Sequence, residues 1–194
     1  MVSLKQTSVK YRGKKAETYE AIRTTQARWA VENETVETWL RELKPVNVLD
    51  CPVGTGRFIP VYRELKIDGV GMDVSKDMLA LAKRKNRMDV LELKCGSATE
   101  TGYPNRAFDM SVCVRFLDLI DNVAMKMVMT ELTRVSSKWI ICTIRLGEKY
   151  LPKSNTAEHD IKKFRTLISV LGFKIKEGKQ FREGSWHILL LERK

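Results

Sequence analysis

From Pro45 onward the chain alternates between short strand-like segments and segments with helical periodicity. The strand-like segments are Val46–Asp50, Ile67–Val74, Val90–Leu93, Phe108–Val114 and Trp139–Ile144. The helix-like segments are a stretch ending near Lys66 and the ranges Ser75–Lys85, Asn122–Val135 and Thr156–Leu171. A strand, a helix and a second parallel strand form a right-handed crossover unit. The repetition therefore predicts an α/β fold with a doubly wound, mostly parallel sheet.

The end of the chain breaks this alternation. Phe173–Phe181 and Trp186–Glu192 are both strand-like, and only four residues separate them. Four residues leave no room for a crossover helix, so these two strands must form an antiparallel hairpin. The sequence thus predicts seven strands, the last two of which are antiparallel.

The residues before Pro45 form a region of a different kind. Lys14–Leu43 has the apolar spacing of one or two amphipathic helices, while Met1–Gly13 shows little periodicity, and we expect it to be mobile. We therefore divide the chain into an N-terminal helical cap or lid, residues 1–44, and an α/β domain, residues 45–194.

The charge of the chain is strongly positive and unevenly distributed. There are 35 Lys and Arg residues against 24 Asp and Glu, a net charge of +11, and residues 145–194 carry the largest share of the excess. Such a surplus attracts an anionic substrate or a nucleic acid, and it equally suits a solvated surface. No apolar run reaches the roughly 20 residues of a membrane helix, and residues 1–15 lack the apolar centre of a secretory signal.

The cysteines indicate neither a zinc site nor a disulfide framework. Cys51, Cys95, Cys113 and Cys142 include no Cys-x-x-Cys pair, and each lies in or beside an apolar stretch. We expect them to act as small buried hydrophobic residues in a reducing, cytoplasmic compartment, and we expect no metal.

The loop after the first strand is the most informative segment. Asp50 is followed by Gly54 and Gly56, which allow the backbone to approach a ligand closely. Pro60 is tolerated best in a first helical turn, so we expect a helix to begin near Gly56 or Arg57, with free N–H groups facing the loop. Ligands of open α/β sheets bind at this edge of the sheet.

A second carboxylate lies 23 residues further along the chain. Asp73 ends the second strand, where an acidic residue can accept hydrogen bonds from ribose hydroxyls. The alternative is that Asp73 caps the helix that begins near Ser75.

Together these residues resemble the class I S-adenosylmethionine-dependent methyltransferases. The first motif of that family, acidic-x-Gly-x-Gly-x-Gly, reads here Asp50-x-Pro52-x-Gly54-x-Gly56, with proline in place of the first glycine. The resemblance extends from Pro45 to the C-terminus and includes the terminal hairpin. It implies that Asp50 and the Gly54–Gly56 backbone hold the methionine end of S-adenosylmethionine, and that Asp73 holds its ribose.

The resemblance also assigns residues to the rest of the cofactor. Met72 and Val74 would lie near the adenine, and Ser97 stands where the family often has an aspartate. Val114 and Arg115 would border cofactor and acceptor. The cofactor residues implied are Asp50, Pro52, Gly54, Gly56, Asp73, Val74, Ser97, Ala98, Val114 and Arg115.

The implied activity is transfer of a methyl group to an oxygen, nitrogen or carbon nucleophile. Because the sulfonium already activates the methyl group, a general base is needed only for an acceptor that keeps its proton. Arg115 and Asp118 are weak catalytic candidates, although Arg115 could simply form a surface ion pair with Asp118. The other possible bases are Tyr19, His159, which we expect at the surface, and His187, which we expect to be structural.

Two other functions stay open at this stage. A nicotinamide-dependent oxidoreductase would need Gly-x-Gly-x-x-Gly, but Ile59 occupies the position of the last glycine. A binding module that serves as a nucleic-acid or protein adaptor would use the positive charge without methyl transfer.

The acceptor of a methyltransferase is constrained less than its cofactor. The segment Val114–Asp118 lacks the motif of amino-DNA methylases, and Cys51-Pro52 reverses the order found in cytosine methylases. A small molecule, a protein or an RNA all fit. We expect Tyr11–Trp29 to form a lid over the cofactor, with the alternative that Trp29 and Trp39 only anchor a helix to the sheet.

Overall fold

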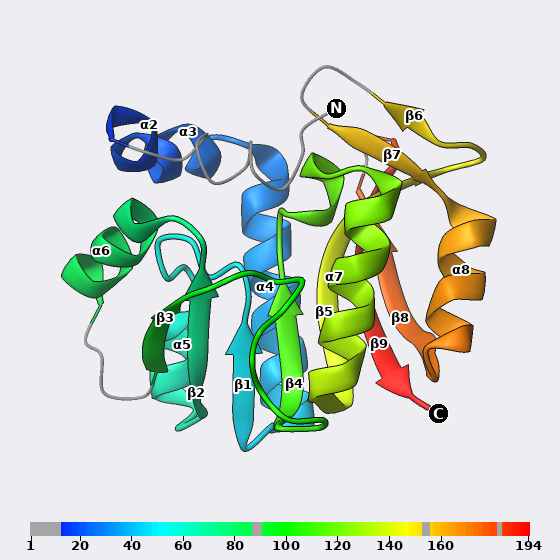
Figure 1. The fold of residues 1–194 in the computed structure, drawn as a ribbon. Helices are drawn as coiled ribbons and strands as arrows, with labels where there is room; N and C mark the ends of the chain where they lie inside the picture. The colour runs from blue at the N-terminus through cyan, green and yellow to red at the C-terminus, as the bar shows by residue number, and fades with distance from the viewer. Residues whose placement is uncertain (1–12, 87–90, 153–155, 182–183) are drawn as a thin grey trace.

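The computed structural model describes residues 13–86, 91–152, 156–181 and 184–194 (Figure 1). Seven strands form the main sheet. Their order is β3 (Leu91–Cys95), β2 (Asp68–Asp73), β1 (Asn47–Asp50), β4 (Phe108–Cys113), β5 (Ser136–Gly147), β9 (Trp186–Arg193) and β8 (Phe173–Gln180). The first five are parallel, and β9 runs antiparallel to both β5 and β8. The doubly wound sheet and its terminal hairpin are thus confirmed.

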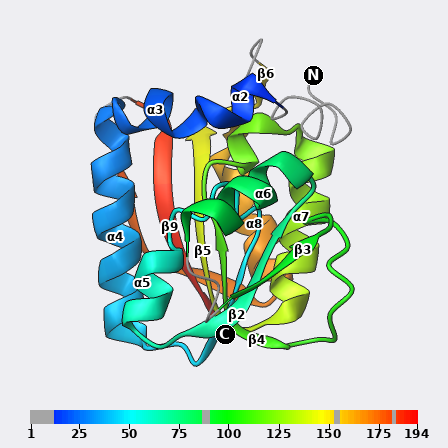
Figure 2. The same ribbon diagram turned by 90° about the vertical axis from the view of Figure 1, so that its left-hand side faces the viewer.

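Helices cover both faces of this sheet. One face carries α4 (Ala27–Leu43), α5 (Ile59–Glu64) and α6 (Lys76–Lys85), and the other carries α7 (Asn122–Val135) and α8 (Ile161–Val170) (Figures 1 and 2). Two short helices, α2 (Lys14–Glu17) and α3 (Tyr19–Thr24), lie across the carboxyl ends of the strands. Of the helices predicted in the N-terminal region, α2 and α3 therefore lie above the edge of the sheet where a ligand is expected, whereas α4 covers one face.

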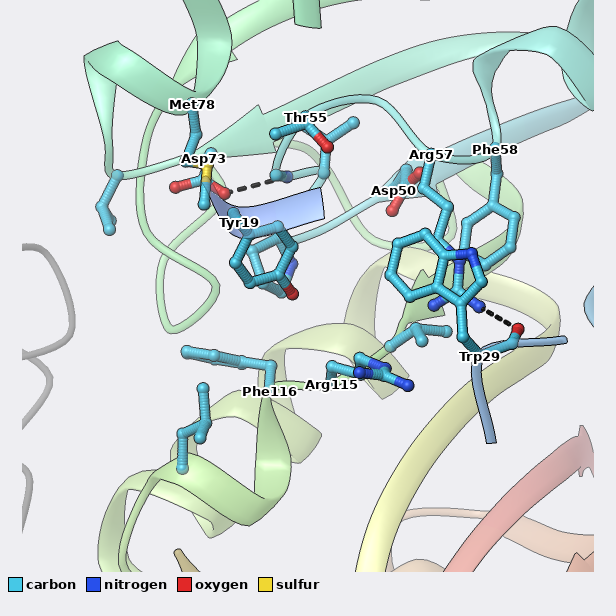
Figure 3. A pocket seen from close by; sticks show the side chains of 16 residues that line it. Tyr19, Trp29, Asp50, Thr55, Arg57, Phe58, Asp73, Met78, Arg115 and Phe116 are labelled. Carbon is cyan, nitrogen blue, oxygen red and sulfur yellow. Dashed lines mark hydrogen bonds between the residues drawn. The ribbon is translucent and has the colours of Figure 1, made fainter. Parts of the chain in front are cut away.

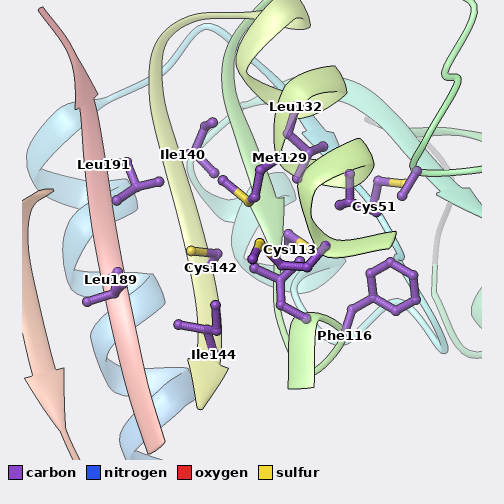
Figure 4. Close-up of a cluster of buried hydrophobic side chains, with 14 of the residues drawn as sticks. Cys51, Cys113, Phe116, Met129, Leu132, Ile140, Cys142, Ile144, Leu189 and Leu191 are labelled. Carbon is purple, nitrogen blue, oxygen red and sulfur yellow. The ribbon is translucent and has the colours of Figure 1, made fainter. Parts of the chain in front are cut away.

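Each face of the sheet has its own hydrophobic core. Along β9, Ile188 and Leu190 pack with α4 and α5, whereas Leu189 and Leu191 pack with α7 and α8. This alternation follows from the two-residue period of a strand that is covered on both sides. Figure 4 shows the second core, in which Leu189 and Leu191 lie near side chains of β5 and α7.

Three of the four cysteines lie in the hydrophobic core on the α7 side of the sheet. Cys51, Cys113 and Cys142 are buried and free, and burial raises the pKa of the Cys142 thiol to about 12 (Figure 4). Cys95 is exposed at the end of β3, contrary to expectation, because this strand lies at the edge of the sheet. Among the described residues no set of His, Cys, Asp and Glu is grouped to hold a metal ion.

The segment between β5 and α8 differs from the sequence prediction. The expected helix Thr156–Leu171 begins only at Ile161, because Asp160 caps it by accepting a hydrogen bond from the Lys163 N–H at 2.9 Å. The residues before it form a short strand, β7 (Ala157–Asp160), which pairs with β5 and with β6 (Leu151–Pro152). A strand of four residues is too short to be separated from a helix start by periodicity.

The structure of Met1–Gly13 expected from the sequence lies outside the described residues, except for Gly13 itself. In the described part of the chain, no helix combines the length and the apolar character needed to cross a membrane.

Candidate functional site

A pocket opens at the carboxyl ends of β1, β2 and β4, under the cap. At this edge β1 lies between β2 and β4, so crossovers leave it in both directions and the flanking loops diverge. The pocket encloses about 80 Å³. It is lined by Tyr19, Trp29, Asp50, Pro52, Val53, Gly54, Thr55, Arg57, Phe58, Asp73, Val74, Met78, Val114, Arg115, Phe116 and Leu119 (Figure 3).

The first wall of the pocket is the loop after β1, held by Asp73. The Gly54 N–H donates a hydrogen bond to Asp73 Oδ2 at 3.0 Å, and the Ser75 N–H donates to Oδ1 at 2.8 Å (Figure 3). The cap of α6 is Ser75, whose hydroxyl accepts from the Met78 N–H at 3.3 Å. Asp73 is therefore not the helix cap; its side chain fixes the loop and lines the pocket.

The two glycines of the loop have different surroundings. Both have positive φ angles, +56° at Gly54 and +79° at Gly56. A Cβ on Gly54 would meet nothing within 4 Å, whereas one on Gly56 would lie 2.6 Å from Ile59 and 2.7 Å from Asn86. Gly54 thus leaves space toward the pocket, and Gly56 is needed for packing.

The helix after this loop begins later than predicted. Helix α5 starts at Ile59 rather than near Gly56 or Arg57, and it contains only six residues. The Gly54 N–H is donated to Asp73 and the Gly56 N–H to the Val53 carbonyl at 3.0 Å. These two N–H groups are therefore not free to bind a ligand in this structure.

Asp50 lies deep in the pocket, at the end of β1. Only 3% of its surface is exposed, and its Oδ2 accepts a hydrogen bond from the Tyr62 hydroxyl at 3.2 Å. Burial raises the pKa of Asp50 to about 8, with a smaller contribution from the charge of Asp73. A cation placed beside this carboxyl would reverse that shift.

A second, smaller cavity of about 40 Å³ shares Pro52, Asp73 and Val74 with the first. Ser97 and Ala98, which were expected near an adenine, line this cavity. The Ser97 hydroxyl hydrogen-bonds Thr99 Oγ1 at 2.8 Å. Met72 lines neither cavity; it packs in the core on the α7 side.

The opposite wall is formed by Val114, Arg115 and Phe116, which follow β4 (Figure 3). Arg115 is buried, so it is not in the surface ion pair with Asp118 that we weighed. Its Nε donates to Glu32 Oε2 at 2.6 Å and its Nη1 donates to Gln26 Oε1 at 2.7 Å. Arg115 therefore joins the end of β4 to the cap.

Glu32 links both walls to the cap and was missed by the sequence analysis. Its Oε2 also accepts from Arg57 Nη1 at 2.8 Å, and Arg57 donates to Asn33 Oδ1. Arg57 also donates to the Trp29 carbonyl (Figure 3). The sequence does contain a signal for the buried position of Glu32. Arg28 and Glu32 lie on the same buried face of α4 as Val36 and Leu40. A charged residue on an otherwise apolar helical face needs a buried partner.

The other candidate bases occupy different places. Asp118 is buried behind the pocket wall, and burial raises its pKa to about 6. His159 is buried, not at the surface as expected; its Nε2 pairs with the Leu117 carbonyl at 2.8 Å and its Nδ1 with Asn122 Oδ1 at 2.7 Å. His187 lies on β9 with Nδ1 against the Ser185 carbonyl at 2.8 Å. Tyr19 alone of these four lines the pocket, and burial raises the pKa of its phenol.

Comparison with known protein families finds a match that covers most of this site. Residues 48–138, which contain the loop, Asp73 and Arg115, match a family model described as a methyltransferase domain. This segment therefore matches a methyltransferase domain. The methyltransferase domain implied by the sequence resemblance is thus confirmed for this part of the chain.

Solved structures share this methyltransferase fold. The chain is similar to magnesium protoporphyrin IX methyltransferase from Synechocystis PCC 6803 with bound SAM, at 17% identity over 83% of this chain and 77% of that one, with a TM-score of 0.69. It is also similar to 1,6-didemethyltoxoflavin-N1-methyltransferase from Burkholderia thailandensis, at 13% identity over 100% and 91% of the two chains, with a TM-score of 0.73. Among curated proteins, none matches the sequence.

Proposed function

We propose that the protein transfers the methyl group of S-adenosylmethionine to an oxygen, nitrogen or carbon nucleophile, with the cofactor held by the first wall of the pocket. The observation that carries this proposal is the hydrogen bond from the Gly54 N–H to Asp73. It joins the glycine loop to the end of β2 and places two buried carboxyl groups, those of Asp50 and Asp73, around one pocket.

The residues present fit this cofactor. The space beside Gly54 admits a ligand to within contact of the backbone, and Asp50 offers a carboxyl group for an ammonium. Asp73 reaches both cavities, which suits a ribose between a methionine end and an adenine end, and Ser97 and Ala98 border the adenine end. Val114 and Arg115 would separate the cofactor from the acceptor.

When bound, the cofactor supplies an electrophilic methyl group on its sulfonium. The chain then has to orient an acceptor and exclude water, since alignment of the reacting atoms provides much of the rate. Tyr19, Trp29, Phe116 and Leu119 give the pocket the apolar surfaces for this task. The rings of Tyr19 and Trp29 come from the cap, so closing the cap excludes water from the site.

We also propose that the cap acts as a lid. Trp29 lines the pocket, whereas Trp39 is buried in the core and its indole N–H donates to Glu177 Oε2 at 2.9 Å. The two tryptophans thus have different surroundings. The enclosed volume of about 80 Å³ is smaller than the ~300–1,000 Å³ of typical small-molecule pockets, so the cap must move to admit a whole cofactor.

The test of the proposed function is binding followed by transfer. Calorimetry should show one site for S-adenosylmethionine and for S-adenosylhomocysteine and none for NADH. Labelled S-adenosylmethionine incubated with the protein and fractionated cell extracts should then yield a labelled acceptor. Folded protein that binds neither adenosyl compound contradicts the proposal. Protein that binds them but labels nothing, and shifts RNA in a salt-sensitive manner, favours the adaptor function instead.

A further inference from the structure

Tyr62, in α5, is completely buried and places its hydroxyl against a residue of the pocket. Its exposed fraction is 0%, and its ring belongs to the core on the α4 and α5 side of the sheet. The hydroxyl oxygen lies 3.2 Å from Oδ2 of Asp50. A buried phenol needs a hydrogen-bond partner, and the carboxyl group at the end of β1 provides one. The packing of the ring therefore holds the hydroxyl against Asp50.

The two oxygens of the Asp50 carboxyl have different surroundings. Oδ2 accepts the hydrogen bond from Tyr62, whereas Oδ1 forms no hydrogen bond within the described residues and is not fully enclosed. Asp50 lines the same pocket as Gly54, beside which a ligand can approach the backbone (Figure 3). One oxygen is thus held from the core side, and the other is left for a ligand.

The ionised form of Asp50 depends on few groups. Burial raises the pKa of Asp50 to about 8, and the hydrogen bond from Tyr62 opposes this rise most strongly. The charge of Asp73, on β2, raises the pKa further, and the charge of Arg57, in the loop, lowers it least. Arg57 donates its printed hydrogen bonds to residues of the cap instead. Among the described side chains, Tyr62 is therefore the one that donates a hydrogen bond to this carboxyl.

The other titratable groups beside Asp50 keep their protons. Burial raises the pKa of the Tyr62 phenol well above its ordinary value, and the charge of Asp50 raises it further. The hydroxyl therefore remains a donor. Burial likewise raises the pKa of the neighbouring thiols of Cys51 and Cys113, so they stay neutral and do not compete for the charge of Asp50.

We propose that Tyr62 is a positioning residue for the cofactor, which keeps Asp50 ionised and leaves its Oδ1 for the ammonium group of S-adenosylmethionine. By donating to Oδ2, the phenol stabilises the carboxylate that a cationic ligand needs. Tyr62 does not itself line the pocket, so it acts through Asp50. This inference rests on the proposed function, because it concerns how the same site holds the same cofactor.

The experiment measures how affinity depends on pH in two variants that each lose one phenol hydroxyl. Calorimetry gives the dissociation constants of S-adenosylhomocysteine and 5′-methylthioadenosine for the full chain, Tyr62→Phe and Tyr103→Phe, on both sides of the Asp50 pKa of about 8. Methylthioadenosine has the adenosine part without the ammonium, so its binding does not report on Asp50. Tyr103 packs against the core on the α7 side and lines neither cavity, which makes it the matched control.

Tyr62→Phe should bind S-adenosylhomocysteine about tenfold more weakly at pH 7, because a hydrogen bond to a charged group is worth at least that factor. The difference should shrink as the pH rises, since the carboxyl then ionises in both proteins. Methylthioadenosine should bind both proteins within about twofold, and Tyr103→Phe should match the wild type. A loss that is equal at every pH, an equal loss for methylthioadenosine, or unchanged affinity at pH 7 overturns the positioning role.

A measurement without ligand separates this proposal from the proposed function. In protein labelled with ¹³C at its aspartate carboxyl groups, NMR follows the titration of Asp50, and Asp50→Asn assigns the signal. The midpoint should move to higher pH in Tyr62→Phe. Binding of S-adenosylhomocysteine with an unmoved midpoint leaves the proposed function and removes the role of Tyr62. A moved midpoint in protein that binds no S-adenosylhomocysteine supports the effect of Tyr62 on Asp50 and contradicts the proposed function.

Tyr62→Phe removes a buried hydrogen bond, so a second substitution covers the case in which this variant does not fold. 3-Fluorotyrosine introduced at position 62 keeps the ring and its hydroxyl but makes the phenol more acidic and thus a stronger donor. The midpoint of Asp50 should then move to lower pH, and S-adenosylhomocysteine should bind more tightly at pH 7. An unchanged midpoint and an unchanged affinity overturn the proposal.

Discussion

The two walls of the pocket are held by different kinds of contact. In the loop wall, a backbone N–H meets a carboxylate 19 residues away, Gly54 with Asp73. The opposite wall consists of Val114, Arg115 and Phe116 together with the cap residues that Arg115 contacts, and we call it the cap wall. In the cap wall, side chains far apart in the sequence meet, such as Glu32 and Arg115, which are separated by 83 residues. The loop wall is formed within one crossover unit, by residues close together in the sequence. It therefore suits binding of the cofactor, which all members of a family share. A wall made from long-range side-chain pairs can change by substitution without altering the loop, so it suits the choice of acceptor.

The largest expected effect comes from Glu32, which connects the two walls. Glu32→Gln leaves Arg57 and Arg115 without their shared anion in a buried place, and breaking a buried ion pair typically costs ~3–5 kcal/mol. We expect urea denaturation to show a loss of about 3 kcal/mol. The control is Glu34→Gln, an exposed position two residues along the same helix, which should change stability by less than about 0.5 kcal/mol. Equal stability of the two variants would mean that the Glu32 network does not hold the cap.

Asp73 tests the loop wall alone. If its carboxylate holds both the loop and a ribose, Asp73→Ala should weaken binding of S-adenosylhomocysteine by about 1.5–3 kcal/mol, roughly 10- to 150-fold. Calorimetry measures this, with Asp68→Ala at the exposed start of the same strand as the control. An Asp73 variant that binds as tightly as the Asp68 variant would restrict Asp73 to a structural role.

Asp50 makes the loop wall sensitive to pH. Its pKa of about 8 means that the carboxyl is largely protonated at pH 6, so binding the ammonium of S-adenosylhomocysteine must release a proton. The dissociation constant should therefore rise about tenfold for each pH unit below 8, measured between pH 6 and 8. In Asp50→Asn this dependence should disappear; a slope that persists in the variant assigns the proton to another group.

The same shift has a consequence for folding, with a defined sign. A carboxyl whose pKa is raised in the folded state favours folding while it is protonated, and this contribution is lost as the pH rises through about 8. The free energy of unfolding of the wild type should therefore fall between pH 6 and pH 9. That of Asp50→Asn should fall less over the same range.

The smallest expected difference separates the two glycines. Both substitutions, Gly54→Ala and Gly56→Ala, place a side chain at positive φ, but only the one at Gly56 also meets Ile59 and Asn86 at less than 3 Å. We expect Gly56→Ala to lose about 1 kcal/mol more stability than Gly54→Ala. Gly54→Ala should instead show the larger loss of affinity for S-adenosylhomocysteine. If Gly54→Ala lost more stability and Gly56→Ala lost more affinity, Gly54 would be the packing residue and Gly56 the residue beside the ligand.

The sequence predicts the loop wall well because its signals are local. The alternation of strands and helices predicts a doubly wound parallel sheet, in which the carboxyl ends of β1 and β2 lie at the same edge. Asp50, Gly54 and Asp73 then fall around one pocket, as the structure shows. The packing role of Gly56 does not follow from its position, since it depends on Asn86 at the far end of α6.

The cap wall is hidden from the sequence for a physical reason. Helical periodicity predicts that one stripe of α4 is buried, but it does not say which strand end that stripe meets. Arg28 and Glu32 therefore read as charges on a buried face, with no indication that Arg57 and Arg115 are near. His159 was misplaced for a related reason, because the short strand β7 turns inward where the pattern suggests the first turn of a helix.

Hydrogen–deuterium exchange with and without S-adenosylhomocysteine tests most directly the claim that one cofactor lies between the two walls. The account predicts slower exchange in three separate segments: residues 50–57 in the loop, residues 73–78 at the start of α6, and residues 16–32 in the cap. The protection of the cap should weaken in Glu32→Gln, while that of the loop remains. Unchanged exchange in residues 50–57 and 73–78 at a saturating concentration of S-adenosylhomocysteine would contradict it.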